Sequence, residues 1–475
     1  MRHGVGKLAR RETCVKMSNQ PKTSGWTEKA RRILEGAEVD RAVFYVLTAR
    51  AWLVPQTLIT LIIICRYLTA EIQGYYYTFF SLIGLQTFFE LGLSQVTLNL
   101  ASHEWSSLRL DASGRITGER EAHSRLTSLA RFSVLWYAAI SCLFVVVVGI
   151  AGYVFLSTQR GSGVDWPQPW CVTAFLAGLT LWAGVFVALL EGCNQVEQIS
   201  LYRLYQTVLS RLVLWTILVL EGGLWAVVGS LGVGLLCTLF LIGYSYRRLF
   251  LSLLTAPSGR RIQWRSEIWP MQWRVGLSSA VSYLGFGIFV PIAFHYQGPV
   301  MAGRMGMTLQ AVGSLHQAAM AWVTTKVPTY GIMIRNKVFE NLDALWFRCS
   351  SISVGLMAAG SLAAWLVVLA LNAWDLSVAQ RLLPVLPTGL FLAGATIFQI
   401  TQCQSAYLRA HRQEPMATMN VTTALVTGLL AWLLGSRFGP VAVAGVYLAV
   451  SGVTVVWGSL IWARCREDWH RGAAS

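Results

Sequence analysis

Long apolar stretches alternate with short polar or basic stretches along nearly the whole chain. Each apolar stretch is close to the roughly 20 residues that an α-helix needs to cross a hydrocarbon core of about 30 Å. Helices are the expected form, because lipid leaves the edges of an open sheet without hydrogen-bond partners. The pattern predicts an all-α membrane protein of about twelve spans, over residues 42–64, 75–98, 132–157, 171–190, 202–220, 224–243, 276–296, 303–325, 351–373, 385–407, 418–436 and 441–463.

Basic residues in the connecting segments predict the orientation. Most of the 38 lysines and arginines fall in the two terminal segments and in alternate loops; the opposite side holds only Arg66, Arg160, Arg304, Arg381 and Arg437. The positive-inside rule then predicts an even number of spans with both termini in the cytoplasm. The net charge of +16 has its explanation in this bias, so nucleic-acid binding is not expected.

The chain divides near its centre. The longest basic connection between central spans covers residues 244–275 and separates a six-helix lobe over 42–243 from a second over 276–463. An ungapped alignment of the two lobes pairs Ala51 with Ala280, Tyr67 with Tyr296, Gly74 with Gly303 and Gly84 with Gly313. Such identities arise from a duplicated hairpin or from a chance match of apolar segments.

The terminal segments are expected to be cytoplasmic tails, over residues 1–41 and 464–475. The first has no apolar core long enough for a cleavable signal peptide, and translation could start at Met1 or Met17. Apolar residues recur in it at helical spacing, which is typical of a helix on the membrane surface and equally of a solvated tail helix. They are Trp26, Ala30, Ile33, Leu34 and Ala37.

Three charged residues lie inside predicted spans. Arg50 and Glu90 each lie about eight residues from the cytoplasmic end of neighbouring spans, and Arg211 enters its own span by a similar distance. One interpretation is a structural ion pair between Arg50 and Glu90. The other is that an unmatched arginine faces a water-filled cavity and binds an anionic substrate, since a guanidinium matches two phosphate oxygens at once.

The eighth span carries a second set of polar residues. We expect one polar face there, which either packs against other helices or lines a cavity for sugar hydroxyls. Gln399, Gln402 and Asn420 would extend that lining, whereas His295 and His316 are expected to be interhelical donors. The residues of the face are Arg304, Gln310, Ser314, Gln317 and Thr324.

Several kinds of chemistry lack their motif. The nine cysteines form no CxxC pair, so neither a disulfide framework nor a metal site is indicated. There is no Walker A sequence, HExxH or DxD, which argues against ATP hydrolysis and metal-dependent sugar transfer. Glu90 is the only acid well inside a span. We therefore predict a transporter without a cofactor, and the scarcity of acids speaks against a cation-driven drug antiporter.

Three segments resemble a known family. They are RYLTAEIQGYYYTFFSLIGLQTFFELG from Arg66 to Gly92, a stretch beginning PMQWRVGLSSAVSYLGFG from Pro270 to Gly331, and LRAHRQEP from Leu408 to Pro415. These are similar to the bacterial polysaccharide exporters, the O-antigen flippase branch of the multidrug/oligosaccharidyl-lipid/polysaccharide (MOP) superfamily. Two features of this chain depart from the pattern. Its basic tail has no recognised counterpart in the family, and its twelve predicted helices lack the additional pair found in the peptidoglycan-precursor branch, which makes that branch less favoured.

The resemblance implies two six-helix lobes, MATE-like, around a central cavity and working by alternating access. It implies a multi-pass protein of the bacterial inner membrane that moves polyprenyl-pyrophosphate-linked oligosaccharide for O-antigen, capsule or exopolysaccharide. Membrane lipids and the polymerase and chain-length components of that pathway would be its partners. The head group would lie at Arg50, Arg211 and Arg304. The alternatives are a multidrug or cation antiporter of the same fold and a membrane-embedded polymerase or glycosyltransferase.

Overall fold

The computed structural model describes residues 41–111, 114–159, 163–253, 259, 262–411 and 413–474. The described chain is helical except for one small β-hairpin, in which β1 (Leu108–Leu110) pairs antiparallel with β2 (Ile116–Gly118). The hairpin was not predicted. Helices cover every predicted span. The expected tail helix around Trp26 falls outside the described residues.

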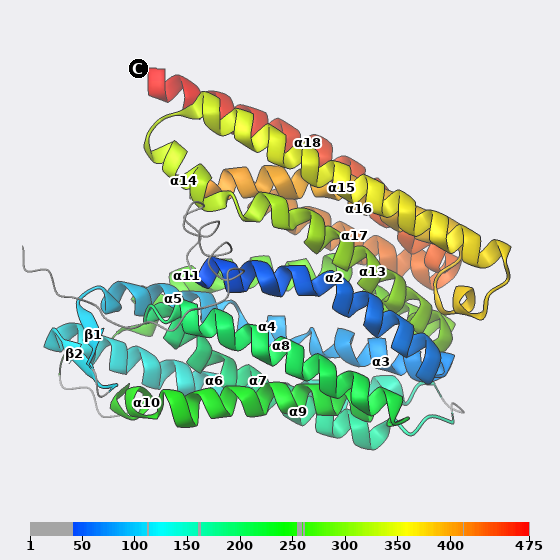
Figure 1. Ribbon diagram of the computed structural model, residues 1–475, viewed down its shortest axis with the longest axis horizontal. Helices are drawn as coiled ribbons and strands as arrows, with labels where there is room; N and C mark the ends of the chain where they lie inside the picture. Colours follow the sequence, from blue (N-terminus) through cyan, green and yellow to red (C-terminus); the bar gives the residue numbers. More distant parts are fainter. Residues whose placement is uncertain are drawn as a thin grey trace, which may run out of the picture.

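The first lobe is a bundle of the helices that precede residue 254 (Figure 1). Its last helix, α9, continues into a π-helical turn, η1 (Leu241–Ser245), and a short surface helix, α10 (Arg247–Leu253). The helices of the bundle are α2 (Arg41–Tyr67), α3 (Ala70–Ile83), α4 (Gln86–Glu90), α5 (Leu93–Trp105), α6 (Arg120–Leu156), α7 (Pro167–Gly192), α8 (Val196–Val219) and α9 (Trp225–Phe240).

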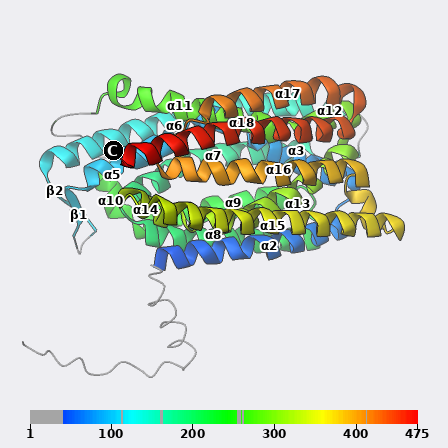
Figure 2. The same cartoon turned by 90° about the horizontal axis from the view of Figure 1, so that it is seen from above.

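The second lobe begins after a further π-helical turn, η2 (Trp264–Ile268), and lies beside the first along its length (Figures 1 and 2). A short 3-10 helix, η3 (Ser377–Arg381), connects two of its spans. The helices of this lobe are α11 (Trp269–Phe286), α12 (Phe289–Gln297), α13 (Pro299–Thr324), α14 (Val327–Arg335), α15 (Phe339–Ala373), α16 (Val385–Ala410), α17 (Ala417–Phe438) and α18 (Pro440–Ala474).

Two of the predicted spans are not continuous helices. The span predicted over residues 75–98 is divided among α3, α4 and α5, and the second break has both Leu91 and Gly92 in the left-handed region, at φ 48° and 67°. The span over 276–296 is divided between α11 and α12 at Gly287. Within the described chain, seven helices are individually long and apolar enough to cross a membrane. The broken spans are not among them, and neither are the more polar α8 and α13.

The two lobes meet tightly where α3 crosses α13. A Cβ built on Gly303 would lie 2.9 Å from the Gly74 backbone nitrogen, and one built on Gly74 would overlap the Pro299 carbonyl. Gln73, which is buried, donates from Nε2 to the Gly303 carbonyl at 2.9 Å. The two glycines that the sequence alignment pairs therefore face each other across the lobe boundary. Figure 1 shows α2 and α13 close together near this crossing and diverging toward their other ends.

Two further contacts join the lobes at the same end. Arg381, in η3, donates from Nη2 to the Leu68 carbonyl at 2.7 Å. Gln159, just beyond α6, donates from Nε2 to the Phe294 carbonyl at 2.8 Å. Each of these contacts uses a backbone carbonyl of one lobe as the acceptor. The end that the positive-inside rule assigns to the exterior is thus closed by side-chain to backbone hydrogen bonds.

Ion pairs fix the opposite end of the molecule. Arg125 on α6 contacts Glu104 at 2.8 Å and Glu267 of η2 at 2.7 Å, which ties the connection between the lobes to the first lobe. In the second lobe, the buried Asp343 accepts from Tyr407 at 2.8 Å and from Arg466 Nε at 2.7 Å. Hydrogen bonds to charged partners are stronger than neutral ones, so these contacts hold the helix ends in place.

Candidate functional site

Polar side chains from three helices meet at the boundary between the lobes. Tyr77 of α3 donates from its hydroxyl to Gln310 Oε1 of α13 at 2.7 Å. One turn further along α13, Ser314 Oγ lies 2.9 Å from Thr57 Oγ1 of α2. Two of the predicted site residues, Gln310 and Ser314, are therefore side by side and bridge the lobes. These bonds close the boundary at this level and would have to break if the lobes moved apart.

Arg211 lies on α8 next to this bridge. Its side chain is half-buried, and its charge acts electrostatically on the hydroxyls of Tyr76 and Tyr77. Within the described part of the chain, the guanidinium has no ion-pair or hydrogen-bond partner. One turn further, Trp215 donates to Thr60 Oγ1 of α2 at 2.9 Å. Trp215 thus fixes the position of α8 next to α2, while the Arg211 guanidinium makes no hydrogen bond to a described residue.

The remaining predicted cations are placed differently. The side chain of Arg50 is outside the described residues, although its backbone belongs to α2. Arg304 donates from Nε to the Gln380 carbonyl at 2.7 Å, near the closed end of the molecule. It does not share a face with Gln310, because six residues correspond to about one and two-thirds turns of a helix. Placing Arg304 on the same polar face was wrong for this reason.

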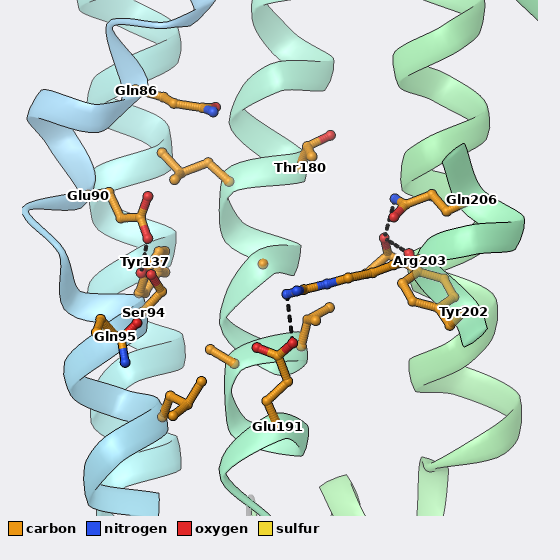
Figure 3. A pocket seen from close by; sticks show the side chains of 16 residues that line it. Gln86, Glu90, Ser94, Gln95, Tyr137, Thr180, Glu191, Tyr202, Arg203 and Gln206 are labelled. Atoms are coloured by element: carbon orange, nitrogen blue, oxygen red, sulfur yellow. Dashed lines mark hydrogen bonds and ion pairs between the residues drawn. The ribbon is translucent and has the colours of Figure 1, made fainter. Parts of the chain in front are cut away.

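Glu90 lies in a pocket inside the first lobe, bounded by α4, α5, α6, α7, α8 and α9 (Figure 3). Its volume is about 480 Å³. The Glu90 carboxylate accepts a hydrogen bond from the Tyr137 hydroxyl at 3.2 Å. No described residue forms an ion pair with Glu90, and the suggested pairing with Arg50 stays a prediction because the Arg50 side chain lies outside the described residues.

An ion pair that the sequence did not suggest crosses the same pocket. Arg203 Nη2 of α8 lies 2.8 Å from Glu191 Oε1 of α7. Figure 3 shows this pair between Glu90 on one side and Gln206 on the other. The pocket therefore combines one cation with two carboxylates. The break at Leu91 and Gly92 directly follows Glu90 and turns the chain from α4 into α5 around this carboxylate.

The second lobe holds a larger polar cavity, of about 590 Å³, between α11, α13, α16, α17 and α18. Gln317, which is exposed, lines it together with Gln402, Asn420 and Arg409. Gln399, which we expected in the lining, instead is buried and donates to Ser353 at 2.8 Å. The cavity thus brings amide groups from three separate helices to one space, and Arg409 adds a cation that the sequence analysis did not select.

Metal ions in proteins need a set of several ligand side chains. No group of three or more histidine, cysteine or acidic side chains suited to a metal ion occurs among the described residues. The two carboxylates of the first-lobe pocket belong to different helices, and one of them is already paired with Arg203. The described residues of these sites present hydrogen-bond donors, acceptors and charges.

Comparison with known proteins identifies the fold. No protein-family model and no curated protein matches the chain. An inward-facing multidrug resistance MATE family transporter of the MOP superfamily has 14% identity and a TM-score of 0.54, over 84% of this chain and 94% of that chain. A eukaryotic MATE transporter has 12% identity and a TM-score of 0.53, over 95% and 100%. A MOP superfamily transporter from Pyrococcus furiosus has 13% identity and a TM-score of 0.50, over 88% and 93%.

At these identities the likeness establishes the fold alone. The chain has the predominantly helical fold of these MATE transporters, which confirms the predicted helical, MATE-like fold class; the cytoplasmic orientation of both termini stays a prediction. This fold is shared with solved structures of transporters. It does not by itself select a substrate, because one fold hosts many functions.

Proposed function

We propose that the protein is a bacterial inner-membrane flippase for polyprenyl-pyrophosphate-linked oligosaccharide in a surface-polysaccharide pathway. Such a lipid cannot cross hydrocarbon unaided, because its hydroxyls and charges would lose their water. A transporter with two lobes can enclose the head group between them while the lipid tail remains outside. The lobes would alternate between opening to the cytoplasm and opening to the exterior.

One observation carries the proposal. Arg211 is a half-buried cation beside the bridge between the lobes, and it has no partner among the described residues. A desolvated, unpaired guanidinium is costly in a membrane unless an anion or water meets it. Its planar fork of donors suits a pyrophosphate. Gln310 and Ser314 lie across the boundary, where sugar hydroxyls could exchange for their present hydrogen bonds.

The polar cavity of the second lobe suits the sugar part of the substrate. Gln317, Gln402 and Asn420 supply both donors and acceptors, which is what hydroxyl groups need. The Pyrococcus furiosus neighbour is described as having reverse polarity of its binding pocket, which suggests a different function for that transporter. A different charge in the pocket can thus accompany a different function within this fold, which supports a site built around an arginine here.

The proposal is tested by replacing Arg211 in a strain that depends on this gene for polymer export. Arg211→Ala should abolish export while the protein remains folded and inserted, and Arg211→Lys should retain part of it. Arg437→Ala serves as the matched control, since Arg437 is exposed at the end of α17. Wild-type export by Arg211→Ala would remove Arg211 from the site.

A cation-coupled antiporter is the second candidate, and the Glu90 pocket favours it. A carboxylate without an ion-pair partner among the described residues, beside a tyrosine hydroxyl, could take up a proton or a sodium ion. This candidate predicts that an imposed ion gradient drives efflux of cationic dyes and that Glu90→Gln abolishes the efflux. Dye efflux that survives Arg211→Ala and is lost in Glu90→Gln would favour the antiporter over the flippase.

A further inference from the structure

An apolar groove runs along the outside of the first lobe between α8 and α9. Its volume is about 720 Å³ and its lining is almost wholly apolar. Tyr205, Leu209, Leu236 and Phe240 line it, and each is between 45% and 65% exposed. In a membrane protein such a surface faces the hydrocarbon. A groove there receives a lipid chain, because no other solvent at that depth can fill it.

The groove ends at a second, polar pocket. This pocket, of about 430 Å³, is lined by Ser245, Arg247 and Arg248, with Gly114 of the β-hairpin connection next to Arg248. Ser245 lines both the groove and the pocket. The rings of Phe240 and Tyr244 stack with centroids 5.1 Å apart and lead from one to the other. The groove and the pocket therefore adjoin at Ser245.

The local fold makes this junction. In η1 the Tyr246 backbone N–H bonds to the Leu241 carbonyl at 3.1 Å, five residues back, which widens the last turn of the span. Turns of this kind occur frequently at functional sites. The Tyr246 hydroxyl donates to Gln195 at 3.2 Å at the start of α8, so the turn is held against the neighbouring helix. This contact holds the turn that carries Arg247 and Arg248 in a fixed position relative to the groove between α8 and α9.

Because the groove and the basic pocket adjoin, we infer that the first lobe binds an anionic membrane phospholipid, with an acyl chain in the groove between α8 and α9 and the phosphate at Arg247 and Arg248. Arg247 is exposed and has no ion-pair partner among the described residues. A basic pocket at the end of a span on the predicted cytoplasmic side matches the negative lipids of that leaflet. An apolar groove followed by a basic pocket matches the apolar acyl chain and the anionic head group of a single phospholipid.

This site is separate from the proposed substrate site. Arg211 lies on the side of α8 that faces α2 and α3, whereas Tyr205 and Leu209 face the groove. Hydrogen bonds between α8 and α9 close the wall between the groove and the Glu90 pocket. They join Tyr202 to Thr238 at 2.6 Å and Gln206 to the Gly234 carbonyl at 2.9 Å. A bound phospholipid would hold α9 and α10 against the lobe without entering the transport path.

The test uses purified full-length protein in mixed micelles with phosphatidylglycerol that carries a photoactivatable diazirine on its acyl chain. After irradiation, peptide mass spectrometry should place adducts in residues 201–209 and 233–241. Phosphatidylcholine with the same chain should give roughly tenfold less adduct, since two arginines favour the anionic head group. The double variant Arg247→Gln/Arg248→Gln should lose this preference, whereas Arg335→Gln/Lys337→Gln, an exposed pair on the second lobe, should keep it.

Three results would overturn the inference: equal labelling by the two lipids, adducts only elsewhere, or displacement of the probe by polyprenyl pyrophosphate at equal concentration. The last would assign the groove to the transported lipid instead. Thermal unfolding without added lipid checks that the arginine variant folds. If it does not, Leu236→Glu provides a second test, because a carboxylate on this exposed groove residue should reduce labelling with the arginines intact.

Discussion

The crossing of α3 and α13 gives the sharpest mechanical prediction, for the substitution Gly74→Ala. A methyl group at Gly74 would overlap the Pro299 carbonyl, and a methyl group at Gly303 would likewise meet the Gly74 backbone nitrogen. The clash is with backbone atoms, so no side-chain rotation can relieve it. The two helices must move apart, and with them the closed end of the two lobes.

The expected size of the effect follows from this packing. Adding a methyl group to a well-packed interior costs typically about 1–3 kcal/mol. A state in which the lobes are separated at this end does not carry that cost. Gly74→Ala should therefore shift the equilibrium toward that state by about 2 kcal/mol, which is a factor of roughly 30 in the ratio of the two states.

Electron paramagnetic resonance distance measurement can detect the shift. Spin labels on Ser157, just beyond α6, and Ser377 in η3 report on the separation of the lobes, and both residues are exposed. Gly74→Ala should add or enlarge a population at longer distance. Gly355→Ala is the matched control, because a Cβ there has no neighbour within 4 Å. An unchanged distance distribution in Gly74→Ala, with unchanged thermal stability, would refute the reasoning.

Two further predictions concern the opposite end of the molecule. Arg125→Gln removes the charge that two carboxylates share. It should lower the unfolding free energy by about 2 kcal/mol and speed proteolysis at η2 (Trp264–Ile268), which Arg125 ties to the first lobe; equal cleavage rates there for variant and wild type would contradict this. Asp343→Asn weakens the buried acceptor of Tyr407 and Arg466, and should lower the free energy of unfolding by about 2 kcal/mol. This is measured as a fall in the midpoint of thermal unfolding of the protein in detergent; an unchanged midpoint would show that the contacts of Asp343 do not contribute to stability.

The positions of the spans could be predicted from sequence because each span must satisfy its own backbone hydrogen bonds and match the thickness of the hydrocarbon. The same reasoning could not detect the breaks at Leu91 and at Gly287. Hydropathy windows count apolar residues, and these breaks depend on backbone dihedrals set by contacts with the other lobe. Gly276, for example, packs directly against the Leu91 backbone. Orientation rests on charge alone and stays a prediction.

The candidate site was only partly predictable. Gln310 and Ser314 were selected from helical spacing, and they do lie together because residues four apart share a face. Arg203 was not selected, since it looked like an ordinary basic residue at a helix end, and its partner Glu191 comes from another helix. Such pairs depend on how helices pack against each other, and the sequence of a single span does not contain that information. The β-hairpin, and its contact with the pocket at Arg247 and Arg248, could not be predicted for the same reason.

The most direct test of the account is a flipping assay with purified protein in liposomes that contain a radiolabelled polyprenyl-pyrophosphate oligosaccharide. A membrane-impermeant enzyme that cleaves the pyrophosphate is added from outside. Without protein, only the lipid in the outer leaflet should be cleaved. The account predicts that wild-type protein exposes the lipid of both leaflets, and that Arg211→Ala leaves the inner leaflet protected. Protection of the inner leaflet with wild-type protein, verified as folded and reconstituted, would contradict the proposal.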